Sequence, residues 1–407
     1  MAVASFPTQH RTVWSLVQTI EALLASMRYV ASPLGRDPRF DLLRGYCVFA
    51  MIVDHVGGTS WLYALTGGNR GPVTAAEGFV FLSGLVLGLV SRKRIDRDGI
   101  RAAIGSSLGR AWTLYGLTVA LTLIFVGLTM WTDLAIWVDR SLLGEVVSWP
   151  ALVTSVVLMR FTWHGTDILA LYALLLAASP LALYLLSEGH HWRLVGGSWA
   201  LWLMFQVAPD HAVIPWPIEH ATTFPFAAWQ ALFVTALVVG YRRDEITAWI
   251  TLPAEQRHRS ELTRRVALGG AASGLLLFGV ALSVGQAHAM GSTATALASL
   301  DVYDKASLGI GRIATFASMA VVIFASLTFF WQPIQRTLGW LLIPLGQASL
   351  YAYAVHLFVI VLAYNVPPYV GSDQAGWELH NTVGQLALVL LVWAMVKRKV
   401  LFGVIPR

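Results

Sequence analysis

The chain has little charge and almost no cysteine. Asp, Glu, Lys and Arg together make up 12% of its 407 residues, whereas 57% are hydrophobic. A soluble core does not absorb that much apolar sequence, so the composition excludes an ordinary soluble protein. The single cysteine, Cys47, excludes a disulfide framework within the chain and a CxxCH haem-attachment motif. The sequence also contains no P-loop, no GxGxxG motif and no repeat of fixed period.

We also expect no usable secretory signal. The apolar stretch 13–30 is interrupted by Gln18, Glu21 and Arg28, and no small-residue cleavage site follows it. We predict that residues 1–38 contain an amphipathic helix on the cytoplasmic surface. The expected transmembrane domain then covers 39–403, and 404–407 form a short cytoplasmic tail.

What the sequence does contain is a series of apolar runs of about 20 residues, the length that crosses a bilayer. They predict an all-α fold, a polytopic integral membrane bundle of about ten transmembrane helices. The expected spans are 42–62, 75–92, 108–130, 164–187, 193–208, 225–241, 265–284, 308–331, 338–363 and 381–402.

Basic residues predict the orientation of this bundle, because Lys and Arg favour cytoplasmic loops. With the N-terminus inside, all but five of the 28 Lys and Arg residues fall on cytoplasmic flanks. Those five are Arg70, Arg140, Arg160, Lys305 and Arg312. Both termini are therefore expected in the cytoplasm. We attribute the net charge of +6 to cytoplasmic loops beside lipid headgroups, so it gives no reason to expect a nucleic-acid ligand.

Polar side chains interrupt several of these spans near one predicted depth, toward the outer face. An ionisable side chain in a transmembrane helix costs about 2.5 to 3.5 kcal/mol and normally faces a bundle interior or a pathway. A single intramembrane His or Gln is usually a satisfied hydrogen bond between helices, but the shared depth favours a buried site. The residues are Asp54, His55, Glu77, His164, Asp167, Gln230 and His356.

The first span combines a cation with an imidazole. Asp41 and Arg44 are three residues apart on one helix face, where they can pair. Arg44 precedes His55 by 11 residues, which is about 16 Å of helix rise. This arrangement suits a long anionic ligand such as a coenzyme A thioester, with its phosphates at Arg44 and its reactive end near His55. The alternative is that Asp41 and Arg44 only mark a membrane boundary.

His55 would need a partner to act as a base. Glu77 or Asp54 could orient it, as a carboxylate does in hydrolytic triads, and the sequence leaves the choice open. His164 and Asp167 share one face of the fourth span at a spacing of three residues.

Several strings of residues carry a family resemblance. In chain order they are Arg39-Phe-Asp41-Leu-Leu-Arg44-Gly with Asp54-His55, Ala75-Ala76-Glu77-Gly-Phe79-Val-Phe81-Leu-Ser83-Gly84, Asp167-Ile-Leu-Ala-Leu-Tyr172 with Ser179-Pro180, Pro225-Phe-Ala-Ala-Trp229-Gln230, Asp304-Lys305 with Leu308-Gly309 and Arg312, and Leu345-Gly-Gln-Ala-Ser349-Leu350 ending in His356. In these strings, which cover nearly the whole chain after residue 38, it resembles the OpgC family of membrane proteins.

The resemblance implies an enzyme of the wider acyltransferase-3 group. These ten-helix enzymes move acyl groups from cytoplasmic acyl-CoA to acceptors, commonly glycans, at the outer side, and the named OpgC member succinylates osmoregulated periplasmic glucans. On this resemblance His55 matches the catalytic base and Arg44 an arginine at the donor end. The chain departs from many of those relatives because Arg110 is followed at i+3 by Thr113 instead of a second arginine.

We therefore expect an O-acyltransferase of the bacterial cytoplasmic (inner) membrane that moves acetyl or succinyl from acyl-CoA to a hydroxyl of an extracytoplasmic glycan. Its expected partners are membrane lipid, acyl-CoA and the glycan, with no metal and no haem. The catalytic candidates are His55, Asp54 and Glu77. The candidate substrate-binding residues are Arg44, Asp41, Arg110, His164, Asp167, Gln230, Arg312 and His356. A transporter or flippase, and a non-catalytic accessory subunit of a larger membrane assembly, stay open as alternatives.

Overall fold

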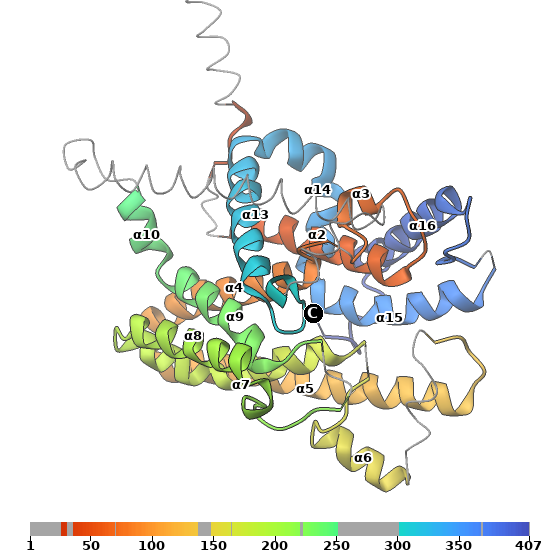
Figure 1. Ribbon diagram of the computed structural model, residues 1–407. Coiled ribbons are helices and arrows are strands. Elements are labelled where there is room, and N and C mark those ends of the chain that lie inside the picture. The colour runs from red at the N-terminus through yellow and green to blue at the C-terminus, as the bar shows by residue number, and fades with distance from the viewer. Residues whose placement is uncertain are drawn as a thin grey trace, which may run out of the picture.

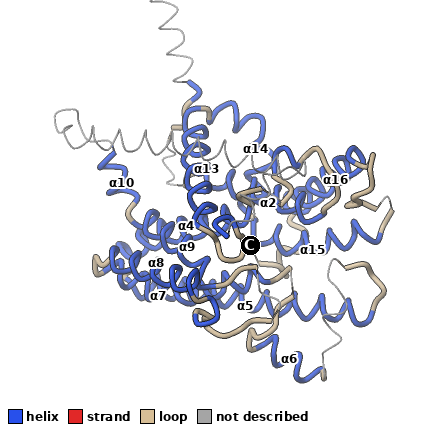
Figure 2. The backbone as a smooth tube through the Cα atoms, viewed as in Figure 1, coloured by secondary structure: helices blue, strands red, loops and turns tan. Residues whose placement is uncertain are grey.

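A computed structural model describes residues 26–30, 36–69, 71–136, 148–163, 165–219, 223–250, 301–367 and 369–406. In these residues the regular elements are helices, and strand-like pairing is limited to one bridge between Phe161 and Glu219 (Figure 2). The elements are α2 (Pro38–Val56), α3 (Tyr63–Thr66), α4 (Ala75–Asp98), α5 (Ile100–Trp131), α6 (Trp149–Val157), α7 (Asp167–Ser187), α8 (His191–Val207), η2 (Pro209–His211), α9 (Phe226–Tyr241), α10 (Arg243–Ile250), η4 (Asp301–Tyr303), α13 (Ile310–Phe329), α14 (Trp331–Gln347), α15 (Ser349–Asn365) and α16 (Glu378–Lys397).

Among the described helices, five are long and apolar enough to cross a membrane: α4, α5, α7, α13 and α16. The pair α14 and α15 passes the same test together. The chain is therefore an all-helical membrane protein with five or six candidate spans in its described part. The predicted span 265–284 and most of the predicted N-terminal amphipathic segment lie outside the described residues.

The predicted span over 338–363 is not one continuous helix. The chain bends by 91° where α14 ends at Gln347 and α15 begins at Ser349. Pro344 lies in the last turn of α14, where the missing backbone N–H weakens the helix. The bend sends α15 across the bundle, beside α2 and α16 (Figure 1).

Helix α2 is also shorter than the predicted span 42–62. Asp37 caps its start by accepting a hydrogen bond from the backbone N–H of Arg39, and Pro38 occupies the first turn. The helix ends at Val56 because Gly57 adopts a φ of 73°, a conformation that L side chains rarely take. His55 therefore lies in the last helical turn, next to a loop.

Glycines let two pairs of helices approach closely. A Cβ atom on Gly346 of α14 would lie 1.8 Å from the carbonyl oxygen of Asp41 on α2. A Cβ atom on Gly88 of α4 would lie 2.2 Å from the carbonyl oxygen of Leu237 on α9. Such contacts are the usual way that membrane helices pack, since lipid tails give no hydrophobic drive for helices to associate.

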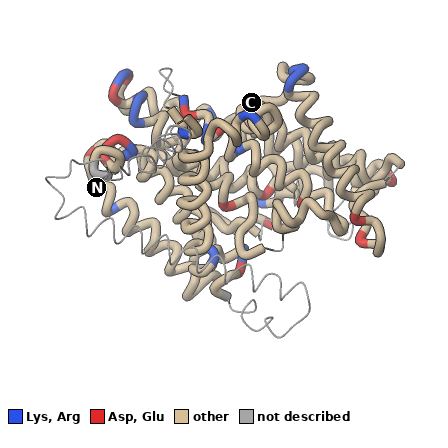
Figure 3. Tube along the Cα trace, turned by 90° about the horizontal axis from the view of Figure 1, so that it is seen from above, with Lys and Arg blue, Asp and Glu red and all other residues tan. Residues whose placement is uncertain are grey.

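Two helix groups follow from this packing. Helices α4, α5, α7, α8 and α9 pack together on one side, and α2, α14, α15 and α16 on the other (Figure 1). Many of the Lys and Arg residues lie along one edge of the molecule, while a mixed group of acidic and basic residues lies inside it (Figure 3). The cavity described next lies where the two helix groups meet.

Candidate active site

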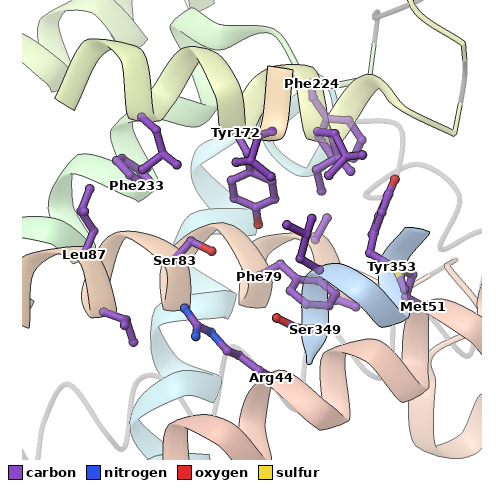
Figure 4. A pocket seen from close by; sticks show the side chains of 18 of the residues that line it. Arg44, Met51, Phe79, Ser83, Leu87, Tyr172, Phe224, Phe233, Ser349 and Tyr353 are labelled. Atoms are coloured by element: carbon purple, nitrogen blue, oxygen red, sulfur yellow. The ribbon is translucent and has the colours of Figure 1, made fainter. Parts of the chain in front are cut away.

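A cavity of about 800 Å³ runs between α2, α4, α5, α7 and α15. Helix α4 lines it from Thr74, just before its first turn, to Arg94, which corresponds to about 30 Å of helix rise. Figure 4 shows side chains from several helices around it, among them Arg44, Ser83, Tyr172 and Tyr353. The cavity is therefore long enough to extend through much of an apolar bilayer core of about 30 Å.

One end of the cavity is cationic, and we call it the arginine end. Its guanidinium groups come from Arg94 and Arg110, on α4 and α5, and Arg44 of α2 lies between this end and the middle of the cavity. Arg44 reaches toward α4, where its Nη2 lies 3.5 Å from the carbonyl oxygen of Leu82 (Figure 4). Hydroxyl groups from Ser91, Ser106 and Ser107 line the same region. Guanidinium and hydroxyl groups are the donors that phosphates usually meet in proteins.

The middle of the cavity is mostly apolar. Phe79 and Leu87 of α4 and Phe233 of α9 line it, with Ser83 and Tyr172 as its polar groups (Figure 4). This apolar stretch lies between the two ends of the cavity. It suits an uncharged chain better than a charged group such as a phosphate.

The opposite end is titratable, and we call it the histidine end. The residues that line it are Asp54 and His55 of α2, Asp167 of α7, Lys305 from the segment between η4 and α13, and Tyr353 of α15. The loop after α2 is held by α16, because the side-chain amide of Gln385 donates to the carbonyl oxygen of Gly57 at 2.9 Å. His55 is thus fixed by packing at a helix end and faces the cavity.

His55 contacts a second histidine. Its Nδ1 lies 3.0 Å from Nε2 of His356, and Nδ1 of His356 is hydrogen-bonded to the carbonyl oxygen of Tyr353. His356 is completely buried and does not line the cavity. The structure therefore brings these two predicted residues together, 301 positions apart in the chain.

Asp54 and Lys305 shape the wall beside His55. Thr66 donates its hydroxyl to Asp54 at 2.5 Å, and Lys305 donates to the side-chain oxygen of Asn69 at 2.9 Å. Burial lowers the pKa of the Lys305 ammonium, while the carboxylates of Glu77, Asp167 and Asp54 act in the opposite direction. Lys305, which the sequence reasoning did not place in the site, thus shares this end of the cavity with Asp54 and Asp167.

Glu77 pairs with Arg312 and not with His55. Its carboxylate accepts from the Arg312 guanidinium and, at 2.9 Å, from the backbone N–H of Thr74. It also accepts from the Thr74 hydroxyl at 2.8 Å, and the side chains of Thr74 and Glu77 each accept from the other's backbone N–H in a capping box at the start of α4. Of the two partners that the sequence left open for His55, Glu77 is therefore paired with a guanidinium from α13.

Asp41 pairs with Arg36 instead of Arg44. The Arg36 guanidinium makes two hydrogen bonds of 2.9 Å to the Asp41 carboxylate, and the Gln347 amide approaches the same group at 3.4 Å. Arg44 turns into the cavity, which Asp41 does not line. The shared helix face allows a pair of Asp41 with Arg44, but Arg36, just before α2, is the partner that Asp41 binds.

Gln230 lies outside the cavity wall. Its side-chain oxygen accepts from the Ser198 hydroxyl at 2.6 Å, and its amide donates to the carbonyl oxygens of Ser198 and Ala227. It therefore ties α8 to α9, and substrate binding by Gln230 stays a prediction. Asp167 does line the cavity, whereas His164 lies outside the described residues.

Sequence reasoning missed Lys305 and Tyr353 at the histidine end. A signal for Lys305 was present, because it is one of the five basic residues that the topology places away from the cytoplasmic flanks. Tyr353 carried no comparable signal, since a tyrosine in an apolar helix is common. Its hydroxyl donates to the carbonyl oxygen of Gly165 at 2.5 Å, at the start of the α7 region.

Comparison with known proteins assigns the chain to a family. The family model of the OpgC protein matches residues 36–401, which include the described helices that line the cavity. The chain belongs to the OpgC family. OpgC membership indicates a membrane-associated enzyme that modifies glucans and is of the acyltransferase type. No curated protein matches the chain.

Proposed function

We propose that this OpgC protein transfers an acyl group from acyl-CoA to a hydroxyl of an extracytoplasmic glycan. The observation that carries the proposal is the single cavity that joins the cationic arginine end to the titratable histidine end. In this arrangement the phosphates of CoA bind Arg44, Arg94 and Arg110. The pantetheine arm follows the apolar middle, and the thioester lies beside His55.

The chemistry assigns one role to His55. Its imidazole takes the proton of the acceptor hydroxyl while that oxygen attacks the thioester carbonyl carbon. The new C–O bond forms as the C–S bond breaks, and the departing CoA thiolate receives the proton from the imidazolium. The products are an acyl ester and CoA with a free thiol, so atoms and charges balance. A positioned base of this kind contributes roughly 10² to 10⁴ in rate.

The acceptor is proposed to meet the polar wall of the histidine end. Asp54, Asp167 and Lys305, together with the amide of Asn69, offer acceptors and donors for sugar hydroxyls. Acetyl and succinyl are the two acyl groups we propose. The same proposal places the protein in the bacterial inner membrane, with the arginine end toward the cytoplasm and the histidine end toward the periplasm.

The geometry favours this function over the alternatives. Arginines at one end and a base at the other suit a reaction between substrates that arrive from opposite sides. A transporter needs no site that holds a thioester beside a base, and an accessory subunit needs no such cavity.

The test is acyl transfer by the purified protein in lipid nanodiscs. Acetyl-CoA and succinyl-CoA are each supplied with glucan oligosaccharides, and the readouts are free thiol and the mass of the glucan. We expect a thiol release that requires glucan and a glucan mass increased by one acyl group. Thiol release without acylated glucan would show that the protein only hydrolyses the thioester, which would contradict the proposed transfer. Failure of both, together with unchanged envelope glycans in a deletion strain, would overturn the proposal.

A further inference from the structure

His356 has two polar contacts and neither is with a charged group. Nδ1 contacts the carbonyl oxygen of Tyr353, one turn earlier in α15, and Nε2 contacts Nδ1 of His55. The side chain is completely buried and its ring packs edge-on against the ring of Tyr353. A buried imidazolium with no carboxylate in contact is unfavourable, so His356 is neutral.

The Tyr353 carbonyl determines where the proton of His356 lies. A carbonyl oxygen has no hydrogen to donate, so Nδ1 of His356 must carry the proton. A neutral imidazole carries one ring proton, which leaves Nε2 of His356 as a hydrogen-bond acceptor. The hydrogen bond to His55 then runs in one direction, from Nδ1–H of His55 to Nε2 of His356.

We infer that His356 is a positioning residue that holds His55 in the Nδ1–H tautomer, so that Nε2 of His55 is the basic nitrogen. This inference rests on the proposed acyl transfer for its catalytic meaning, but the tautomer itself follows from the contacts of Tyr353, His356 and His55. The 91° bend before α15 is what brings His356 to this place.

The arrangement replaces the carboxylate of a hydrolytic triad by a neutral imidazole. When Nε2 of His55 takes a proton, its Nδ1–H keeps donating to His356, so the imidazolium stays oriented and hydrogen-bonded. Asp54 and Glu77, the two carboxylates that the sequence offered as partners of His55, have hydroxyl, backbone or guanidinium partners of their own. A neutral acceptor also avoids leaving a permanent negative charge in the apolar layer.

Two substitutions separate orientation from packing. His356→Gln can keep an acceptor near the position of Nε2, whereas His356→Phe keeps the ring volume and removes both polar contacts. We expect His356→Phe to lower kcat about 100-fold or more, within the range of a general base, with KM for acyl-CoA changed less than about twofold. The kcat of His356→Gln should be at least about tenfold higher than that of His356→Phe. Equal kcat values for the two variants, or a loss confined to KM, would overturn the inference.

Nitrogen NMR of the histidine rings tests the tautomer without any activity. The protein is labelled with ¹⁵N-histidine, and His55 is assigned by comparison with a His55→Gln variant. We expect a protonated Nδ1 and an unprotonated Nε2 on His55 in the unsubstituted protein, and a shift toward the Nε2–H form in His356→Phe.

An Nε2–H form of His55 in the unsubstituted protein would overturn the inference whatever the enzyme does. The Nδ1–H form in a protein that transfers no acyl group would instead overturn the proposed function and leave the positioning by His356 standing.

Discussion

Glu77 on α4 and Arg312 on α13 form an ion pair that is buried on both sides. The Glu77 side chain is 0% exposed and that of Arg312 is 5% exposed. Arg312 also donates from Nη1 to the carbonyl oxygen of Tyr303, at the end of η4. The pair thus connects the start of α4 with the segment that carries Lys305 into the histidine end.

We expect the removal of one charge from this pair to destabilise the protein strongly. Glu77→Gln keeps an acceptor for the Thr74 cap but leaves the Arg312 cation without its counter-charge, which typically costs about 3 to 5 kcal/mol in a buried pair. Adding Arg312→Gln removes the second charge and should restore part of the loss. The measurement is thermal unfolding in detergent followed by the fluorescence of the 17 tryptophans. Strictly additive losses would contradict the ion-pair interpretation.

His55→Ala should abolish acyl transfer while the protein stays folded in the membrane. Loss of a general base predicts a fall of roughly 10² to 10⁴ in kcat. His211→Ala, at an exposed histidine of η2 outside the cavity, is the matched control and should keep full activity. Acylated glucan is measured by mass spectrometry, and membrane abundance by gel. A His55→Ala protein within a few fold of the unsubstituted rate would remove the assigned role.

Arg44→Ala should weaken donor binding. A hydrogen bond to a charged group contributes about 1.5 to 3 kcal/mol, so KM for acyl-CoA should rise about 10- to 100-fold with little change in kcat. Arg44→Lys should restore only part of the loss, because an ammonium does not reproduce a bidentate guanidinium contact.

The matched control is Arg193→Ala, at an exposed arginine of α8 that does not line the cavity. Calorimetric titration with acyl-CoA gives the affinities directly. Unchanged acyl-CoA affinity in Arg44→Ala would leave Arg44 as a marker of the membrane boundary.

The two ends of the cavity should face opposite sides of the membrane. Asp98 lies between the basic helix ends of α4 and α5, whereas Gln374 lies in the loop 366–377, which contains no Lys or Arg. In a Cys47→Ala background, Gln374→Cys should react with an impermeant maleimide on intact spheroplasts. Asp98→Cys should stay protected until lysis. Labelling of Asp98→Cys on intact cells would reverse the topology, and the route of cytoplasmic acyl-CoA to the arginine end would fail with it.

Local sequence determined the helical membrane character of this protein and much of the cavity wall. Apolar runs of bilayer length predict helices, and a fixed rise per residue places Arg44 and His55 about 16 Å apart on α2. Both residues line the cavity. Such inferences succeed because hydropathy and spacing along one helix depend only on residues close together in the chain.

The tertiary structure decided which polar side chains form ion pairs and hydrogen bonds with one another. Glu77 pairs with Arg312, Asp41 with Arg36, and His55 with His356. The sequence had offered Asp54 or Glu77 as the partner of His55, and Arg44 as the partner of Asp41. The pair of His55 and His356 depends on the 91° bend that turns α15 toward His55, and glycine contacts bring α2 against α14. Neither can be read from hydropathy, because a bend and a close approach result from packing between segments far apart in the chain.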